Sequence, residues 1–441
     1  MNEQEKYYIK NSPIINSTNK ASLFRKYLMN MPKFDEFIKD ISENNYLYWD
    51  KVKYRKPVEG YTVEESWQVS RWVRTIKSVK MPVKTVSGEY FYSYRTQKVD
   101  SLLRTFDMKA GGNMIGHKIQ LSDSEKNRFM IRGIMEESIS SSELEGADTS
   151  SKYAKKMLAE NIKPRNASEQ MILNHYKTLR KIDRDYKNRE MSRELLLEIQ
   201  EILTENAIEE PNQSGRFRAD KDEIVVQYKQ KISHIPPNEK FLNEQIDEMI
   251  QYANNTEDSV HPLVKAIVLH FWIGYLHPFC DGNGRTARSI FYWYLLRNDY
   301  WAILYLPISS TLKNAKDQYA MSYIYAEQDQ NDFTYFFEFI TKKILQAISE
   351  FDLYIDRKVL ENKYLSSKVK NLNLNPRQQQ VVGLLLKDPS NKVTGKSHSI
   401  MSSVSLKTAY RDLKELEKLK IVSTSRSGKN VDYYISEKFR L

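Results

Sequence analysis

Residues 277–288 of this 441-residue chain concentrate groups that can bind phosphate. The run Gly282-Asn283-Gly284 lets the backbone turn and leaves free amide N–H groups at the start of the segment that follows. If that segment is a helix, its N-terminus carries about half a positive charge and favours an anion. Arg285 and Arg288 are three residues apart, so both can approach one anion from the first turns of that helix. The spacing therefore predicts a phosphate site.

Two more residues of this stretch could carry chemistry. The imidazole of His277 can take a proton from an attacking hydroxyl near neutral pH. Asp281 would face the same anion as the arginines unless a cation lay between them, and Mg²⁺ is usually held by one or two carboxylates plus substrate phosphates. Asp281 could instead cap the second helix, and His277 could be a buried or capping residue. Together the residues favour metal-assisted transfer of a phosphorus-containing group.

Two apolar helices are expected to position the stretch. Upstream, apolar residues and a glycine recur at helical spacing, and a proline suits the first turn: Pro262, Leu263, Ala266, Ile267, Phe271 and Gly274. This helix should deliver His277 at its C-terminal end. Downstream the same spacing is found at Ala287, Ile290, Phe291, Tyr294 and Leu295, so a second buried helix should start inside the stretch.

The run His-Pro-Phe-x-Asp-Gly-Asn-Gly-Arg-x-x-Arg at 277–288 resembles the full signature of the Fic (Fic/Doc, or Fido) family. The resemblance implies a helical domain that transfers AMP from ATP to a Ser, Thr or Tyr hydroxyl of a protein and releases pyrophosphate. It also implies a role for each residue: His277 as base, Asp281 as Mg²⁺ ligand, Asn283 with the amides of Gly282 and Gly284 at the α-phosphate, and Arg285 and Arg288 at the outer phosphates.

A second resemblance concerns residues 124–146. Apolar residues at helical spacing predict a helix from Ser124 to Ser142 that a glycine closes. Its end, with Ser141, Glu145 and Gly146, is similar to the family's inhibitory motif, Ser/Thr-x-x-x-Glu-Gly/Asn. The resemblance implies that Glu145 pairs with Arg288 and so keeps the arginine from the outer phosphate. The alternative is a glutamate that merely ends a helix, where the helix dipole disfavours it.

Short β-branched runs between polar turns predict a hairpin over residues 223–237. The order Gly215-Arg216-Phe217-Arg218, a strand and Pro236-Pro237 resembles the family's flap, which holds a target by strand addition. On that resemblance Ile224 to Gln227, and with them Val225 and Val226, line the nucleotide and target cleft.

The rest of the chain divides at two predicted linkers, 111–116 and 371–376. Residues 1–110 are rich in aromatic residues and should form short helices that end in a strand at Tyr90–Tyr94; packing against the central domain is favoured over a separate binding module. Residues 111–370 form the expected Fic domain, with the inhibitory helix at about 124–146.

Residues 371–441 are expected to form a winged helix-turn-helix. Helices are predicted at Gln378–Leu386, at His398–Val404 and from Ser405, and a basic-tipped hairpin follows. From Pro376 onward 13 Lys and Arg stand against 6 Asp and Glu, which suggests a nucleic-acid contact. The candidate DNA-binding residues are Lys407, Thr408, Arg411, Lys414, Arg426 and Lys429. The module could equally dock a protein or dimerise.

Composition sets the class of protein. With 40% hydrophobic and 28% charged residues, a net charge of +11 and one cysteine, the chain is expected to be mainly α-helical and globular, with a β-hairpin flap and no internal disulfide. No apolar run is long enough for a membrane helix, and Met1–Lys6 lack a signal peptide's apolar region, so a cytoplasmic location is expected.

The sequence thus predicts a protein adenylyltransferase (AMPylator) that uses ATP and Mg²⁺ and is inhibited by its own Glu145. Its partners would be a target protein, which could be the chain itself, and DNA; a homodimer is a further expectation. Two alternatives stay open. In one, Glu145 positions water to remove AMP from a modified target, which makes the chain a de-AMPylase. In the other, the pocket only senses nucleotide for a DNA-binding regulator.

Overall fold

The computed structural model describes residues 7, 9, 12, 13, 20–111, 123–370, 373–387, 391–427 and 430–440. Helices dominate these residues, and the strands form three separate two-stranded antiparallel hairpins. The chain divides into two compact units, residues 1–349 and 350–441. The mainly helical fold with small hairpins that the sequence predicts is confirmed. Parts of both predicted linkers, 112–116 and 371–372, lie outside the described residues.

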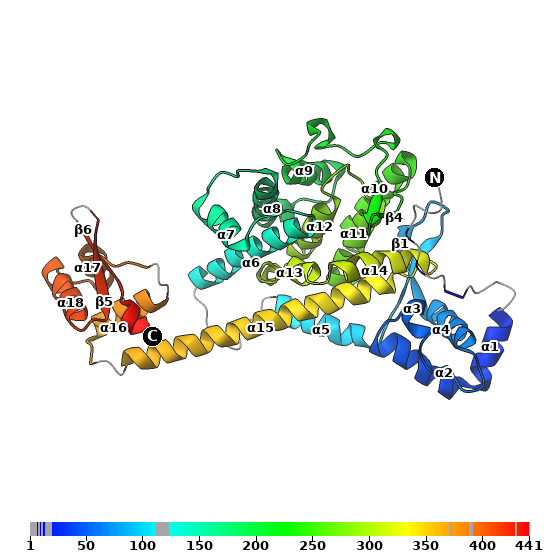
Figure 1. Cartoon of the computed structure of the whole chain (residues 1–441), viewed down its shortest axis with the longest axis horizontal. Coiled ribbons are helices and arrows are strands. Elements are labelled where there is room, and N and C mark those ends of the chain that lie inside the picture. Colours follow the sequence, from blue (N-terminus) through cyan, green and yellow to red (C-terminus); the bar gives the residue numbers. More distant parts are fainter. Residues whose placement is uncertain are drawn as a thin grey trace. The chain divides into compact units, whose positions relative to one another are not determined.

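The N-terminal part of the first unit is a cluster of short helices followed by a hairpin (Figure 1). Its elements are α1 (Lys20–Met29), α2 (Met31–Ile38), a π-helical turn (Lys39–Asn44), α3 (Trp49–Val52), α4 (Val63–Lys77), β1 (Ser78–Lys84), β2 (Tyr90–Tyr94) and α5 (Lys98–Ala110). A reciprocal capping box starts α4, because the Thr62 hydroxyl accepts from Glu65 N–H and the Glu65 carboxylate accepts from Thr62 N–H. The predicted strand at 90–94 is confirmed.

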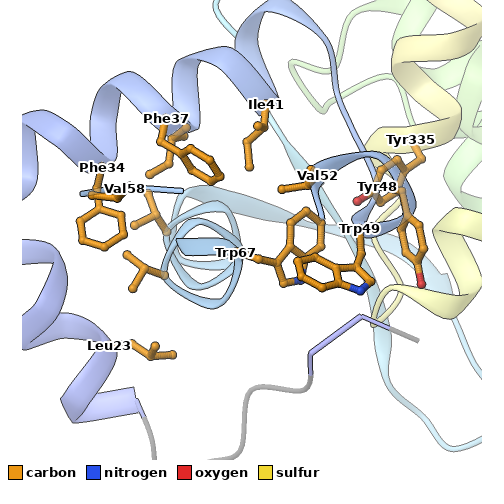
Figure 2. Packing of buried hydrophobic residues seen from close by; sticks show 13 residues of the cluster. Leu23, Phe34, Phe37, Ile41, Tyr48, Trp49, Val52, Val58, Trp67 and Tyr335 are labelled. Carbon is orange, nitrogen blue, oxygen red and sulfur yellow. The ribbon is translucent and has the colours of Figure 1, made fainter. Parts of the chain in front are cut away.

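These helices share a buried aromatic core with the helix α15 (Thr334–Lys370). Figure 2 shows Trp49 and Trp67 at its centre, with Tyr48 and Tyr335 of α15 close by. The ring centroids of Tyr48 and Tyr335 are 5.9 Å apart. The N-terminal part therefore packs against the central helices, as the aromatic-rich sequence predicts.

The central part of the first unit surrounds two almost fully buried helices, α11 (Pro262–Leu276) and α12 (Asn283–Arg297), which pack along each other. Around them lie α6 (Asp123–Leu144), α7 (Ser151–Glu160), α8 (Ala167–Arg184), α9 (Arg193–Thr204), the hairpin β3 (Val226–Tyr228) and β4 (Lys231–His234), α10 (Glu239–Asn254), α13 (Ile308–Lys313) and α14 (Lys316–Gln328) (Figure 1). Both predicted helices that flank residues 277–282 are confirmed.

The second unit holds the rest of α15 and a small module with its own apolar core. The module consists of α16 (Pro376–Lys387), α17 (Gly395–Ser402), α18 (Leu406–Lys418), β5 (Val422–Ser427), β6 (Asn430–Ile435) and α19 (Glu437–Arg440). Ser405 caps α18 by accepting from Thr408 N–H, at the predicted position. Three helices followed by a hairpin agree with the predicted element order, and the assignment as a winged helix-turn-helix stays a prediction.

None of the helices in the described part of the chain is long and apolar enough to cross a membrane.

Candidate active site

The loop between α11 and α12 places His277 at the C-terminus of a buried helix. The His277 N–H donates to Ile273 O at 2.9 Å, and its backbone takes the left-handed conformation, φ 47°. Gly282 is also left-handed, φ 83°, and α12 begins at the next residue. Two left-handed residues within six positions turn the chain back on itself, so the end of one helix faces the start of the other.

Two side chains stabilise this loop: Asn283, the residue directly after it, and Arg218, which comes from a distant part of the chain. Asn283 closes it, since its Oδ1 accepts from Phe279 N–H at 2.9 Å and its Nδ2 donates to Phe279 O at 2.7 Å. Arg218 holds it from outside, donating from Nε to His277 O at 2.8 Å and from Nη2 to Leu276 O at 3.1 Å. The side chain of Asn283 is thus used by the loop, and what α12 presents to an anion is its backbone N–H groups.

Both arginines of the motif are buried in the first turns of α12. Arg285 donates from Nη1 to Leu203 O at 2.8 Å and from Nη2 to Asp281 Oδ2 at 3.1 Å. Arg288 donates from Nε to the Ser141 hydroxyl at 2.7 Å and from Nη2 to Glu145 Oε1 at 2.8 Å. Among the residues described, Arg285 Nε and Arg288 Nη1 have no hydrogen-bond partner. Each guanidinium therefore keeps one donor that a ligand could use.

Glu145 places an anion at the start of α12. It follows the last residue of α6, and Gly146, with φ 100°, turns the chain away. A Cβ at Gly284 would come within 2.1 Å of Glu145 Oε1, so the carboxylate lies directly against the backbone of the first turn of α12. Burial opposes ionisation of Glu145, but the positive charge of Arg288, its hydrogen bond to the carboxylate and the charge of Arg285 together outweigh burial and lower the pKa of the carboxyl. An ionised carboxylate thus stands where the sequence predicts a phosphate.

His277 is held neutral by its surroundings. Burial, and after it the positive charge of His234, lowers its pKa to about 4, although Glu145 acts in the opposite direction. A neutral imidazole near pH 7 can accept a proton, so the electrostatics suit a general base.

Asp281 fits a single-carboxylate magnesium site. Its side chain is 46% exposed; Oδ1 accepts from Gly282 N–H, and Oδ2 accepts from Arg285. Within the described residues no three His, Cys, Asp or Glu side chains group together as a metal site. A cation at Asp281 would therefore take its remaining ligands from phosphates and water, which is how Mg²⁺ is commonly bound.

The hairpin that the sequence predicts is confirmed, with shifted bounds. Glu223, φ 49°, ends a 3-10 turn in a left-handed conformation, so regular pairing starts only at Val226; Ile224 and Val225 precede the strand. Gln227 is exposed, whereas Val225 and Val226 are half-buried. Lys229 and Gln230 both have positive φ, typical of the two-residue turns that join such strands.

Three residues that support the site were not singled out from the sequence. Gln200 of α9 donates to Asp281 O at 3.1 Å and accepts from Gly215 N–H at 2.6 Å. The side chain of Arg218 holds the loop, and His234 lies between Tyr275 O and Glu327. Arg218 and His234 fall inside motifs noted above, which was a usable signal; nothing near Gln200 in the sequence indicates its role.

The DNA-binding candidates lie in the second unit. Lys407, Arg411 and Lys414 are exposed on α18, and Thr408 is half-buried next to the Ser405 cap. Arg426 belongs to β5, and Lys429 lies outside the described residues.

Comparison with known proteins shows that part of this chain matches a known family. Residues 190–295 match the Fic/DOC family. A protein adenylyltransferase Fic of Nematostella vectensis is 32% identical over 88 residues, which is 20% of this chain and 19% of that protein. One from Drosophila mojavensis is 28% identical over 147 residues, 33% of this chain and 26% of that protein. The chain thus spans about a fifth to a quarter of the length of these curated relatives.

Two solved structures share the fold. A Fic family protein from Desulfovibrio desulfuricans G20 superimposes with a TM-score of 0.51 at 18% identity, over 76% of this chain and 96% of that one. Fic-1 (residues 134–508) from C. elegans gives a TM-score of 0.50 at 16% identity, over 68% and 80% of the two chains. The matched residues include α11, the loop after it and all of α12 except its last two residues, so this part of the chain is a Fic/DOC family domain.

Proposed function

We propose that this chain is a protein adenylyltransferase that moves AMP from ATP to a Ser, Thr or Tyr hydroxyl of a protein. The observation that carries the proposal is the anion site at the start of α12, where the Glu145 carboxylate lies against Gly284 and pairs with Arg288. A phosphate needs the same surroundings as that carboxylate: helix N–H groups and a guanidinium. The relatives named protein adenylyltransferase support AMP as the group that moves.

In the proposed reaction the α-phosphate lies on the N–H groups of Gly282 to Gly284. Arg285 and Arg288 hold the outer phosphates with the donors they have left. Neutral His277 takes the proton of the target hydroxyl, its oxygen forms a bond to the α-phosphorus, and the bond to pyrophosphate breaks. Mg²⁺ held by Asp281 and the phosphates would neutralise charge on the leaving group.

The same contacts support inhibition by α6. While Glu145 occupies the start of α12 and holds Arg288, a triphosphate cannot use either group in the same way. Replacing Glu145 by Gly should therefore raise AMP transfer, and His277→Ala should abolish it.

The test is incubation with ATP labelled in the α-phosphate, followed by detection of labelled protein. Glu143→Gly is a matched control, because Glu143 lies two residues before Glu145, in the last turn of α6, but pairs with Lys313 and Ser151 instead. Expected is strong labelling by Glu145→Gly, and parental labelling by Glu143→Gly. Equal labelling by the parent and Glu145→Gly would contradict the inhibition, and labelling that survives His277→Ala would contradict the mechanism.

De-AMPylation is a second candidate, which the ionised state of Glu145 favours. The side chain as a whole is 34% exposed, so water can reach part of it although burial acts on its carboxyl. If Glu145 orients water, the parent should release AMP from a target modified by the Glu145→Gly variant, and Glu145→Gly itself should not.

DNA binding by the second unit is an independent candidate. α18 buries Ala409, Leu413 and Leu416 and exposes Lys407, Arg411 and Lys414. Fluorescence anisotropy with a labelled duplex tests it: the pair Lys407→Glu and Arg411→Glu should weaken binding and lower the salt slope by about 2. Reversing two exposed lysines of the first unit, Lys163 and Lys240, is the control. DNA retention without AMP transfer in any Glu145 variant would favour the nucleotide-sensing regulator.

A further inference from the structure

His234 ends the second strand of the flap and joins three elements. Its Nε2 lies 2.7 Å from Tyr275 O, in the last turn of α11. Its Nδ1 lies 2.7 Å from Glu327 Oε2, near the end of α14. The imidazole side chain is only 10% exposed, so both contacts are largely protected from water.

The partners fix the protons on this ring. A carbonyl oxygen only accepts, so Nε2 must carry a hydrogen and donate to Tyr275 O. A carboxylate oxygen also only accepts, so a second hydrogen must lie between Nδ1 and Glu327. Burial disfavours the charged ring, but the charge and hydrogen bond of Glu327 and the hydrogen bond to Tyr275 O together outweigh burial and raise the pKa of His234. The C-terminal end of α11, with its partial negative charge, favours a cation at the same place.

We propose that His234 is a positioning residue for AMP transfer: bonded to Glu327 and to Tyr275 O, it clamps the flap onto the end of α11 that carries His277. This inference rests on the proposed function, because it concerns where a target held by the flap lies relative to the base. His277 is two residues beyond Tyr275, so the clamp fixes the flap against the last turn before the reacting group.

Contacts of Tyr7 with both strands of the hairpin agree with a flap that is held in place. Tyr7 N–H donates to Ile232 O at 2.7 Å, and the Tyr7 ring lies 4.9 Å from that of Tyr228. Gln328, the last residue of α14, accepts from Ile9 N–H at 3.2 Å and donates to Tyr7 O at 3.1 Å. Tyr7 thus contacts both the hairpin and α14.

The clamp has a chemical signature that simple packing lacks. Its charge depends on one proton, and the charged groups around the pair are Glu327 of α14, Arg218 and, beyond Tyr275, His277. Because the pKa of His234 is raised, the clamp is complete at low pH and weakens as pH rises through that pKa. The flap should therefore loosen with rising pH.

Hydrogen exchange of the amides of residues 226–234 tests the clamp without using catalysis. His234→Leu removes both bonds, whereas His234→Gln keeps an amide donor for Tyr275 O but no charge. Exchange should be about tenfold faster in His234→Leu, because loss of a charge-assisted hydrogen bond has about this effect. Exchange in His234→Gln should be accelerated less, because one donor remains. Glu327→Gln should act in the same direction.

Lys229→Gln is the matched control. Lys229 also reaches from the flap to α14, where Nζ lies 3.8 Å from Asp317 Oδ2, but both side chains are largely exposed. The Lys229→Gln variant should therefore exchange the amides of residues 226–234 at the parental rate. After correction for the intrinsic rate, exchange in the parent should rise with pH, and that rise should disappear in His234→Gln. Unchanged exchange in His234→Leu, or an equal pH response in His234→Gln, would overturn the clamp.

Kinetics in the Glu145→Gly background connect the clamp to the reaction. His234→Gln should raise KM for the protein acceptor about tenfold and raise KM for ATP less, because the proposed phosphate contacts lie on α12 and only Val225, Val226 and Gln227 of the flap are expected to line the nucleotide cleft. An unchanged acceptor KM, or an equal rise for ATP, would contradict the positioning role. If no variant transfers AMP, the proposed function fails, and hydrogen exchange still decides whether the clamp exists.

Discussion

Arg288 and Ser141 are joined by two hydrogen bonds, from Nε to the hydroxyl at 2.7 Å and from Nη2 to the main-chain oxygen at 3.1 Å. Nη2 also donates to Glu145 Oε1, and Glu145 lies one turn further along the chain. The segment that we propose to be inhibitory therefore holds this guanidinium through two residues, Ser141 and Glu145. A nucleotide that needs Arg288 competes with a neutral hydroxyl as well as with an anion.

Ser141→Ala should release part of the inhibition. It removes the acceptor of Arg288 Nε but leaves the ion pair with Glu145, so AMP transfer should rise less than in Glu145→Gly. The buried Nε–H loses its partner, which should cost about 1–3 kcal/mol of stability. Labelling with ATP and thermal unfolding measure the two effects.

Ser138→Ala is the matched control for Ser141→Ala. Ser138 is also buried on α6, but its hydroxyl donates to Ile134 O within the helix. The control should leave AMP transfer at the parental level. Equal activation by both alanine variants would show that loosening of α6, and not the bond to Arg288, raises activity.

Gly284→Ala should be coupled to Glu145. The added Cβ would meet Glu145 Oε1 at 2.1 Å and Arg288 Nη1 at 3.0 Å, so the carboxylate must leave the start of α12. We expect Gly284→Ala to destabilise the parent and to cost at least about 1 kcal/mol less in the Glu145→Gly background, where the collision with the carboxylate is gone. A double-mutant cycle from thermal unfolding measures the difference. Additive costs would contradict the contact.

A matched glycine separates this coupling from general effects of alanine. Gly383 lies in α16, and a Cβ there would meet no atom within 4 Å. Gly383→Ala should be neutral or stabilising, by about 1 kcal/mol at most, because alanine favours a helix interior. Its effect should be the same with and without Glu145.

The pH profile should report the lowered pKa of His277. A base must be unprotonated, and an ordinary imidazole would lose about half its activity near pH 6.5. With a pKa of about 4, His277 should cause no loss of kcat/KM in the Glu145→Gly variant as the pH falls from about 8 to 6. Removing Glu145 also removes a charge that raises this pKa, so the acid limb should lie lower still. An acid limb near pH 6.5 would contradict the expected burial.

The site's own loop was predictable because its determinants are local. The glycines and the paired arginines lie within residues 282–288, the helical spacing directly flanks them on both sides, and the structure confirms both helices. The hairpin was predictable for the same reason, but its start was not. The turn that ends at Glu223 depends on Asp222, whose carboxylate binds Arg216 and Ala219 N–H, and alternation of residue types does not reveal such bonds.

The supporting contacts were not predictable, because they join distant parts of the chain. Gln200 and Asp281 are 81 residues apart, and His234 and Glu327 are 93 apart. A single sequence does not show which distant residue a buried glutamine or histidine will contact. The role of the N-terminal part was hidden in the same way: its aromatic residues indicated a core but not the helix α15 that completes it.

Arg71 supplies the last prediction, because it joins that N-terminal part to the turn before α15. Its guanidinium Nε lies 3.2 Å from Asp329 Oδ1, and Nη1 lies 3.6 Å from Asp332 Oδ2; the three side chains are 6%, 1% and 3% exposed. Arg71→Leu would leave two buried carboxylates without this cation, so it should cost about 3–5 kcal/mol in urea unfolding. Arg55→Leu is the control: Arg55 lies 3.7 Å from Asp40 with both side chains nearly half exposed, and the loss should stay within about 1 kcal/mol. Equal losses of unfolding free energy in the two variants would mean that the N-terminal part does not depend on the ion pairs of Arg71. A large loss confined to Arg71→Leu would show that these ion pairs, and not only the aromatic core, hold the N-terminal part in place.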